Sequence, residues 1–222
     1  PSPNLTKFTL EEALQLLPIH SSQQAAVCGF TGTVVYYHYG CDGLNDAGWG
    51  CGYRACQTQL HWLLSNSKLQ HPDPEVPAIP AMQSALVAMG DKPPSFTGSR
   101  EWIGCLEAAY LADKFANRRC RILHQNSQSS EVNVDVKSLK KHFEDVGCPV
   151  MMGGHTDASA KTVLAVSGSD TDLLLLDPHY GRVVNSPPLS LSGLVHEGWL
   201  SWRSVDSLTE TAFYNMCLPL TD

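Results

Sequence analysis

No run of apolar residues in this sequence approaches the roughly 20 that a helix needs to cross a bilayer. The apolar runs are only a handful of residues long, as at 173–176. The chain does not open with a basic segment followed by an apolar core, so no secretory signal is visible. We therefore expect a cytoplasmic protein without a membrane segment.

Cysteine patterns that are typical of metal sites are also absent. The eight cysteines are spread over 222 residues, and no two of them have the CxxC spacing of a structural zinc site. A chain of this length without a secretion signal does not need a disulfide framework. We expect reduced thiols, no bound metal and no other cofactor.

Basic residues are too few for a surface that binds nucleic acid. Fifteen Lys and Arg against 22 Asp and Glu give a net charge of −7, whereas binding to a phosphate backbone requires a basic face. Hydrophobic residues make up 43% of the chain, which is enough for a complete core. At roughly 100–200 residues per domain, we assign one domain to 1–222. About 1–30 would form an N-terminal extension, and nothing demands more than a monomer.

Local patterns predict helices and strands in an order that indicates the fold class. Thr9 and Glu12 have the spacing of a capping box, Asp135 is placed to cap a helix that ends at Gly147, and 65–80 is proline-rich. Because helices fall mainly in the first two-thirds and strands in the last third, we expect an α+β fold with an antiparallel sheet. The predicted helices are 10–17, 81–89, 102–114, 135–146 and one after Gly50 with a buried stripe of Cys56, Leu60, Leu63 and Leu64; the predicted strands are 31–39, 119–124, 149–152, a hairpin of 161–167 with 173–177, and segments in the last 25 residues.

Cys51 is the first candidate for chemistry. It lies between a glycine-rich loop and the start of the predicted helix. The unpaired N–H groups and the positive end of the dipole at such a position favour a thiolate over a thiol. The alternative for a single cysteine is a structural role in the core.

Asp177 and His179 form the second candidate, at the end of a predicted strand. Residues i and i+2 of an extended chain point to the same side, about 6–7 Å apart. Asp177 can therefore hold the imidazole in one tautomer while the other ring nitrogen faces a thiol. The alternative is an ordinary Asp-Pro turn. Tyr39 is a third candidate, as an oxyanion donor, although its place among strand aromatics also fits plain packing.

Four stretches together resemble the ubiquitin-fold-modifier-specific cysteine proteases: NDAGWGCGYRACQ, GSREWIG, MMGGHTDASAKTVLAVSG and LLLLDPHYG. The length is similar to that of the small single-domain form. The WGC and DPH motifs are shared with the autophagy-related cysteine proteases and by themselves indicate only the wider papain-like set. The resemblance implies a papain-like fold in which the nucleophile's helix packs on an antiparallel sheet. It implies Cys51 as nucleophile, His179 as general base, Asp177 as its orienting residue and Tyr39 in the oxyanion hole.

Further residues are candidates for a cleft that accepts an extended peptide tail. Gly153 and Gly154 allow close backbone approach, and His155 follows them in a predicted loop. Trp49 would narrow the cleft so that only glycine enters. Trp102 would wall it, although core packing is the favoured interpretation of that residue.

Three functions follow from these residues. The first is a thiol protease that cleaves after the C-terminal glycine of a ubiquitin-fold modifier, in its precursor or in conjugates. The second is an autophagy-type protease for another ubiquitin-like protein. The third is a non-catalytic module that binds a ubiquitin-like protein through the same cleft, and the intact set of catalytic residue types speaks against it.

Overall fold

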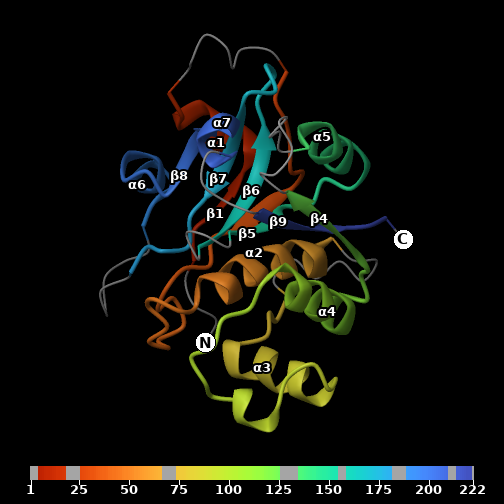
Figure 1. Ribbon diagram of the computed structural model, residues 1–222. Helices are drawn as coiled ribbons and strands as arrows, with labels where there is room; N and C mark the ends of the chain where they lie inside the picture. Colours follow the sequence, from red (N-terminus) through yellow and green to blue (C-terminus); the bar gives the residue numbers. More distant parts are fainter. Residues whose placement is uncertain are drawn as a thin grey trace.

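The centre of the molecule is an antiparallel sheet of seven strands (Figure 1). The computed structural model describes residues 5–18, 26–66, 74–125, 135–154, 159–181, 189–209 and 214–221. The strand order is β4-β9-β5-β6-β7-β8, and β2 pairs with β6. A smaller sheet pairs β1 with β3, also antiparallel. The strands are β1 (Lys7–Thr9), β2 (Cys28–Gly29), β3 (Thr33–Val35), β4 (Cys120–Gln125), β5 (Val150–Gly154), β6 (Ala160–Val166), β7 (Asp172–Leu176), β8 (Leu200–Ser204) and β9 (Tyr214–Pro219).

Helices surround this sheet, and α2 and α4 lie next to each other on one side of it (Figure 1). None of the described helices is long and apolar enough to span a membrane. The helices are α1 (Leu10–Leu16), α2 (Cys51–Ser65), α3 (Ile79–Ala88), α4 (Cys105–Ala116), α5 (Val136–Asp145), α6 (Leu191–His196) and α7 (Val205–Thr209), with a short 3-10 helix at Pro94–Phe96.

Helix α2 is buried on all sides. Every residue from 51 to 63 is shielded from solvent, because the helix packs against β3, β5 and β6 as well as α4. Of the predicted stripe, Cys56, Leu60 and Leu63 are buried and Leu64 is half-buried, but the buried surface extends around the whole helix. The polar residues Gln57, Thr58 and Gln59 are as deeply buried as the leucines.

The buried polar side chains of α2 tie it to its neighbours by hydrogen bonds. Gln59 Nε2 donates to the backbone oxygens of Pro149 and Cys217, at 2.8 and 2.9 Å. Trp62 Nε1 donates to the Thr31 oxygen at 2.6 Å. A buried polar group is costly unless it finds such a partner, so these bonds fix where along the sheet the helix lies.

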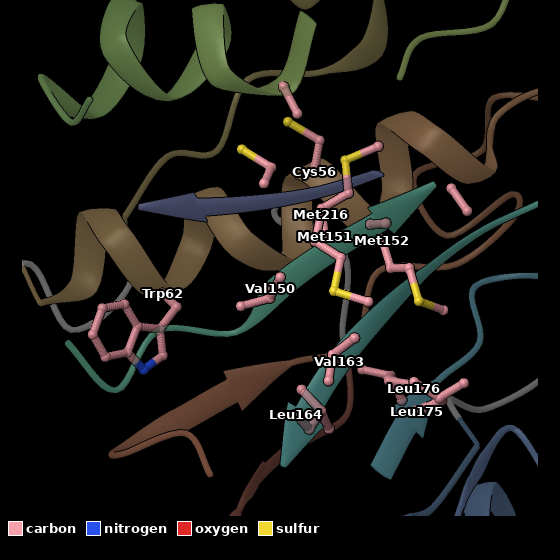
Figure 2. Close-up of a cluster of buried hydrophobic side chains, with 14 of the residues drawn as sticks. Cys56, Trp62, Val150, Met151, Met152, Val163, Leu164, Leu175, Leu176 and Met216 are labelled. Carbon is pink, nitrogen blue, oxygen red and sulfur yellow. The ribbon is translucent and has the colours of Figure 1, made fainter. Parts of the chain in front are cut away.

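The core between α2 and the sheet is formed mainly by aliphatic and sulfur-containing side chains. Figure 2 shows Met151, Met152 and Met216 in a cluster of buried side chains that also contains Val163 and Leu176. Residues 173–176 of β7 are all buried, so both faces of this strand are covered. Each buried side chain of this kind stabilises the fold by about 1.5–3 kcal/mol relative to an exposed one.

Several local predictions are confirmed. The Thr9–Glu12 capping box is formed at the start of α1. Asp135 accepts from the N–H of Ser138 at 2.9 Å and caps α5. Strands β6 and β7 pair as an antiparallel hairpin, and Gly147 follows α5 with φ of +73°. The α+β class with an antiparallel sheet is as expected.

Other predictions were wrong in their bounds. The strand expected at 31–39 is only Thr33–Val35. The helix expected from Trp102 starts at Cys105, because Glu107 Oε2 accepts from the Gly104 N–H at 2.8 Å and caps it there. The last third contains α6 and α7 among its strands. In 65–80, α2 extends to Ser65 and α3 already begins at Ile79; residues 67–73 lie outside the described part of the chain.

The hydrogen bonds of Gln59 generate a stability prediction. Gln59→Leu leaves two buried carbonyl oxygens without this donor, and losing a buried partner costs about 1–3 kcal/mol. Urea unfolding should show a loss of that size. The control is Gln15→Leu on exposed Gln15 of α1, which should change stability by less than about 0.5 kcal/mol. Equal stability of the two variants would contradict the structural role of Gln59.

Candidate active site

Cys51 is the first residue of α2, directly after the loop 40–50. Its side chain is almost fully buried, with 7% of the residue exposed. Gly48 has φ of +83°, a conformation that favours glycine, just before the helix begins. The first N–H groups of the helix have no partner within it, so the sulfur lies where a negative charge is favoured.

Asp177 and His179 follow the end of β7. The Asp177 N–H donates to the Trp199 oxygen at 2.8 Å, which continues the pairing of β7 with the chain before β8. His179 Nδ1 forms a short hydrogen bond with Asp177 Oδ1, and the His179 N–H donates to the same oxygen at 3.0 Å. These bonds orient the imidazole as the i, i+2 spacing predicted.

The other side of the imidazole meets the Cys51 thiol. Hydrogen bonds to Asp177 and then to Cys51 raise the pKa of His179 to about 9. Burial alone would raise the pKa of Cys51, but hydrogen bonds from His179, the Ala160 backbone and Tyr39 together hold it below its ordinary value. The pKa of Asp177 is also lowered: its hydrogen bonds to His179 outweigh the opposite effect of burial. Cys51 and His179 therefore favour a thiolate–imidazolium pair.

Tyr39 completes this group. Burial, and then the negative charge of Cys51, raise the pKa of its hydroxyl, which hydrogen-bonds to Cys51 and to the Gly48 backbone. The hydroxyl therefore keeps its proton and remains a donor beside the sulfur. Its ring packs edge-on against His179 with centroids 5.2 Å apart, and its N–H donates to the Pro178 oxygen at 3.1 Å.

Residues before Tyr39 support the segment that carries Asp177 and His179. The Tyr36 hydroxyl donates to the Asp177 backbone oxygen at 2.6 Å. The His38 ring lies between those of Tyr36 and Tyr180, with centroids 5.1 and 5.0 Å away. The sequence analysis gave Tyr36 and His38 no role; the one available signal was their i, i+2 spacing within the predicted strand 31–39.

A groove of about 380 Å³ leads away from Cys51. One wall is the loop before α4, and the other is formed where β5 and β6 meet. Its lining consists of Cys51, Gly52, Trp102, Ile103, Gly104, Cys105, Gly153, Gly154, Ser159, Ala160 and Asn215.

Close contact with α2 fixes the first wall. A Cβ on Gly52 would lie 2.5 Å from the Ile103 oxygen, so only glycine allows this approach of the loop. The Tyr53 hydroxyl donates to the Glu101 oxygen at 2.9 Å. The loop is thus held against the first turn of the helix that begins with Cys51.

Only some of the residues predicted for the cleft line the groove. Trp102 and the pair Gly153-Gly154 line the groove. Trp102 is 55% exposed, so the favoured interpretation of core packing was wrong. Trp49 is not part of the lining: it is buried, packs edge-on against Tyr53 at 5.8 Å between centroids, and does not narrow this groove. His155 lies outside the described residues.

Gly153 keeps the groove open rather than allowing close packing within the protein. A Cβ built on it would lie 3.7 Å from Cys105 Sγ, an ordinary contact. The fold therefore does not require glycine here. The missing side chain leaves room in the groove for the backbone of a ligand.

Three charged residues near the site were missed by the sequence analysis: Asp42, Asp46 and Arg54. Arg54 is completely buried and bonds to both carboxylates, with Asp46 at 2.7 Å and Asp42 at 2.8 Å. The one available signal was that Arg54 is the only Lys, Arg, Asp or Glu between 51 and 65. Within the described ranges, no three His, Cys, Asp or Glu side chains gather in a way that would hold a metal ion.

Comparisons with known proteins show which family this chain is similar to. The profile of "Peptidase family C78" matches residues 25–217. The chain is 41% identical to Ufm1-specific protease 1 of Mus musculus, over 90% of this chain and 89% of that protein. It is 37% identical to Ufm1-specific protease 2 of the same species, over 87% of this chain but only 40% of that protein. The crystal structure of UfSP from C. elegans superposes with a TM-score of 0.75 at 30% identity, covering 98% of this chain and 38% of that one.

The hydrogen bond between Cys51 and His179 predicts selective alkylation at low pH. A thiol reacts with iodoacetamide as its thiolate, and well below the pKa each unit of pKa changes the thiolate fraction about tenfold. At pH 6, Cys51 should react faster than Cys28, whose thiol pKa is raised by burial and by Glu144. His179→Ala should slow Cys51 at least about tenfold at pH 6 and leave Cys28 unchanged. Mass spectrometry of the labelled peptides measures both rates; equal labelling of Cys51 in the variant and the wild type would contradict the ion pair.

Proposed function

The chain belongs to peptidase family C78, and from this membership we propose that it is a thiol protease that cleaves Ufm1 after its C-terminal glycine. The single observation that carries the proposal is the assembly of Cys51, His179, Asp177 and Tyr39 at the end of a groove. The relatives named above are Ufm1-specific proteases. Those names favour Ufm1 over the substrate of an autophagy-type protease.

The chemistry follows from the resting hydrogen bonds. The Cys51 thiolate attacks the glycine carbonyl carbon, and the carbonyl oxygen becomes an oxyanion. The Tyr39 hydroxyl, which points at the sulfur before reaction, then donates to this oxyanion together with the Cys51 backbone N–H. The His179 imidazolium gives its proton to the leaving amine as the C–N bond breaks.

The resulting thioester is hydrolysed by the same groups. His179, now neutral, takes a proton from water, and the hydroxide adds to the thioester carbonyl. Collapse breaks the C–S bond, restores the thiolate–imidazolium pair and releases the glycine as a carboxylic acid, which loses its proton to solvent. Asp177 holds the imidazole through both steps. The leaving amine belongs to the next residue of a precursor or to a lysine of a conjugated protein, and both reactions use the same geometry.

The groove provides a reason for glycine at the cleaved position. A tail that enters between the loop at Trp102–Gly104 and the segment Gly153-Gly154 passes the exposed Trp102 side chain and three glycines that add no side chain to the lining, Gly104, Gly153 and Gly154. A glycine tail can lie with its backbone close to these glycines, and we expect a residue with a Cβ at the cleaved position to fit less well.

Substitution of the catalytic residues tests the proposal. Cys51→Ser should abolish cleavage of Ufm1 precursor but retain binding, since only the nucleophile is lost. His179→Ala should lower kcat more than Asp177→Ala, because Asp177 acts through His179. The double variant with both substitutions should have a kcat no lower than that of His179→Ala alone. Cleavage is followed by mass spectrometry and binding by calorimetry. Full activity of His179→Ala would rule out this mechanism.

Tyr39→Phe tests the oxyanion donor. One such donor is worth about 2.7–4 kcal/mol in the transition state, or roughly 10²–10³ in kcat. KM should change little because the donor acts only in the transition state. Tyr39→Ala serves as the comparison and should also lower the melting temperature, since it removes a buried ring. If Tyr39→Phe retains more than about a third of kcat, a change of under ~1 kcal/mol, the hydroxyl has no such role.

A further inference from the structure

The Asp46 carboxylate lies between Gly40, which follows Tyr39, and Gly50, which precedes Cys51. Its Oδ1 accepts from the Gly40 N–H at 2.7 Å. On the other side, a Cβ on Gly50 would lie 2.0 Å from its Oδ2, so the carboxylate is in direct contact with the Gly50 backbone. The Asp46 backbone oxygen also accepts from the Gly50 N–H at 2.8 Å.

Arg54 holds this carboxylate in place from within α2. Its Nε donates to Asp46 Oδ2 at 2.7 Å, and both Asp46 and Arg54 are completely buried. Its two terminal nitrogens donate to the Asp42 carboxylate at 2.9 and 2.8 Å. The guanidinium thus reaches from the first turn of α2 back to the loop 40–50 and fixes the loop to the helix.

The loop needs such a restraint. Gly40, Gly43 and Gly48 all have φ between +67° and +90°, a range that glycine adopts readily because it has no Cβ. For the same reason, a glycine backbone is freer to change conformation than that of any other residue. Leu44 N–H donates to Asp42 Oδ1 at 3.1 Å, but this bond restrains only the outer part of the loop. Asp46 contacts Gly40 at one end of the loop and Gly50 at the other.

We propose that Asp46 is a positioning residue that sets the separation of the two oxyanion donors, the Tyr39 hydroxyl and the Cys51 backbone N–H. This rests on the proposed function, which assigns those donors their role. Net stability is a poor reason for a buried ion pair, because the cost of removing both charges from water offsets much of their attraction. Precise placement is what such a pair provides here, and a misplacement of about 1 Å in a catalytic site costs roughly 100-fold in rate.

The experiment compares Asp46→Asn with Asp42→Asn. Both variants remove one carboxylate charge from Arg54, but Asp42 bonds to Arg54 and Leu44 rather than to Gly40. On Ufm1 precursor, Asp46→Asn should lower kcat roughly 10- to 100-fold with KM nearly unchanged. Asp42→Asn should stay within about threefold of wild type in kcat, well below the effect of losing one oxyanion donor.

Two further readouts separate positioning from general loosening. Alkylation of Cys51 by iodoacetamide needs the thiolate but no oxyanion hole, so its rate and pH profile should be the same in Asp46→Asn and wild type. In a Tyr39→Phe background, Asp46→Asn should cost clearly less than it does alone, because the two residues act on one donor.

The outcomes distinguish a failure of the proposed function from a failure of the inference about Asp46. A wild-type enzyme that does not cleave Ufm1 precursor overturns the proposed function and this inference with it. An active wild type with equal kcat values for Asp46→Asn and Asp42→Asn overturns only the inference, as does a parallel loss of Cys51 alkylation. If Asp46→Asn does not fold, Asp46→Asn combined with Arg54→Gln removes one buried charge of each sign and takes the same tests, with the same expected fall in kcat at constant KM.

Discussion

The hydrogen bond between the Cys51 thiol and the His179 imidazole joins the two parts on which the molecule is built. Cys51 begins the buried helix α2, and His179 follows β7, the sheet strand that lies next to the edge strand β8. The bond forms only if α2 lies in one position along the sheet, and the buried Gln59 and Trp62 hydrogen bonds provide that position. The extensive core in Figure 2 therefore has a direct chemical consequence, because it holds a thiolate against an imidazolium.

Hydrogen bonds also fix the part of the site where the oxyanion develops. Tyr39 is tied to the His179 segment through Pro178, and the residue after it is tied to the start of α2 through Asp46. Nucleophile, base and oxyanion donor thus come from three segments that are bonded to one another rather than only to the core. Such mutual support is what preorganisation of a reactive site requires.

The sequence predicted those parts of the site that depend on local geometry. Asp177 and His179 were found because i and i+2 at a strand end face the same way, and Cys51 because a glycine-rich loop led into a helix. The parts that depend on tertiary contacts were missed. Trp102 was placed in a helix because nothing local reveals that Ile103 packs on Gly52. Asp46 and Arg54 were passed over because charged residues are usually exposed, and only the fold shows that they are buried against each other.

The proposed function requires that the Cys51 thiolate, at the end of this groove, attacks the C-terminal glycine of Ufm1. Ufm1 carrying an electrophile in place of its last carboxylate tests that claim most directly, because capture requires the tail to reach Cys51 and the sulfur to be nucleophilic. We predict a single covalent adduct, located at Cys51 by peptide mass spectrometry, and no adduct with the same electrophile on ubiquitin. Equal labelling by ubiquitin, or an adduct at any other cysteine, would contradict the claim.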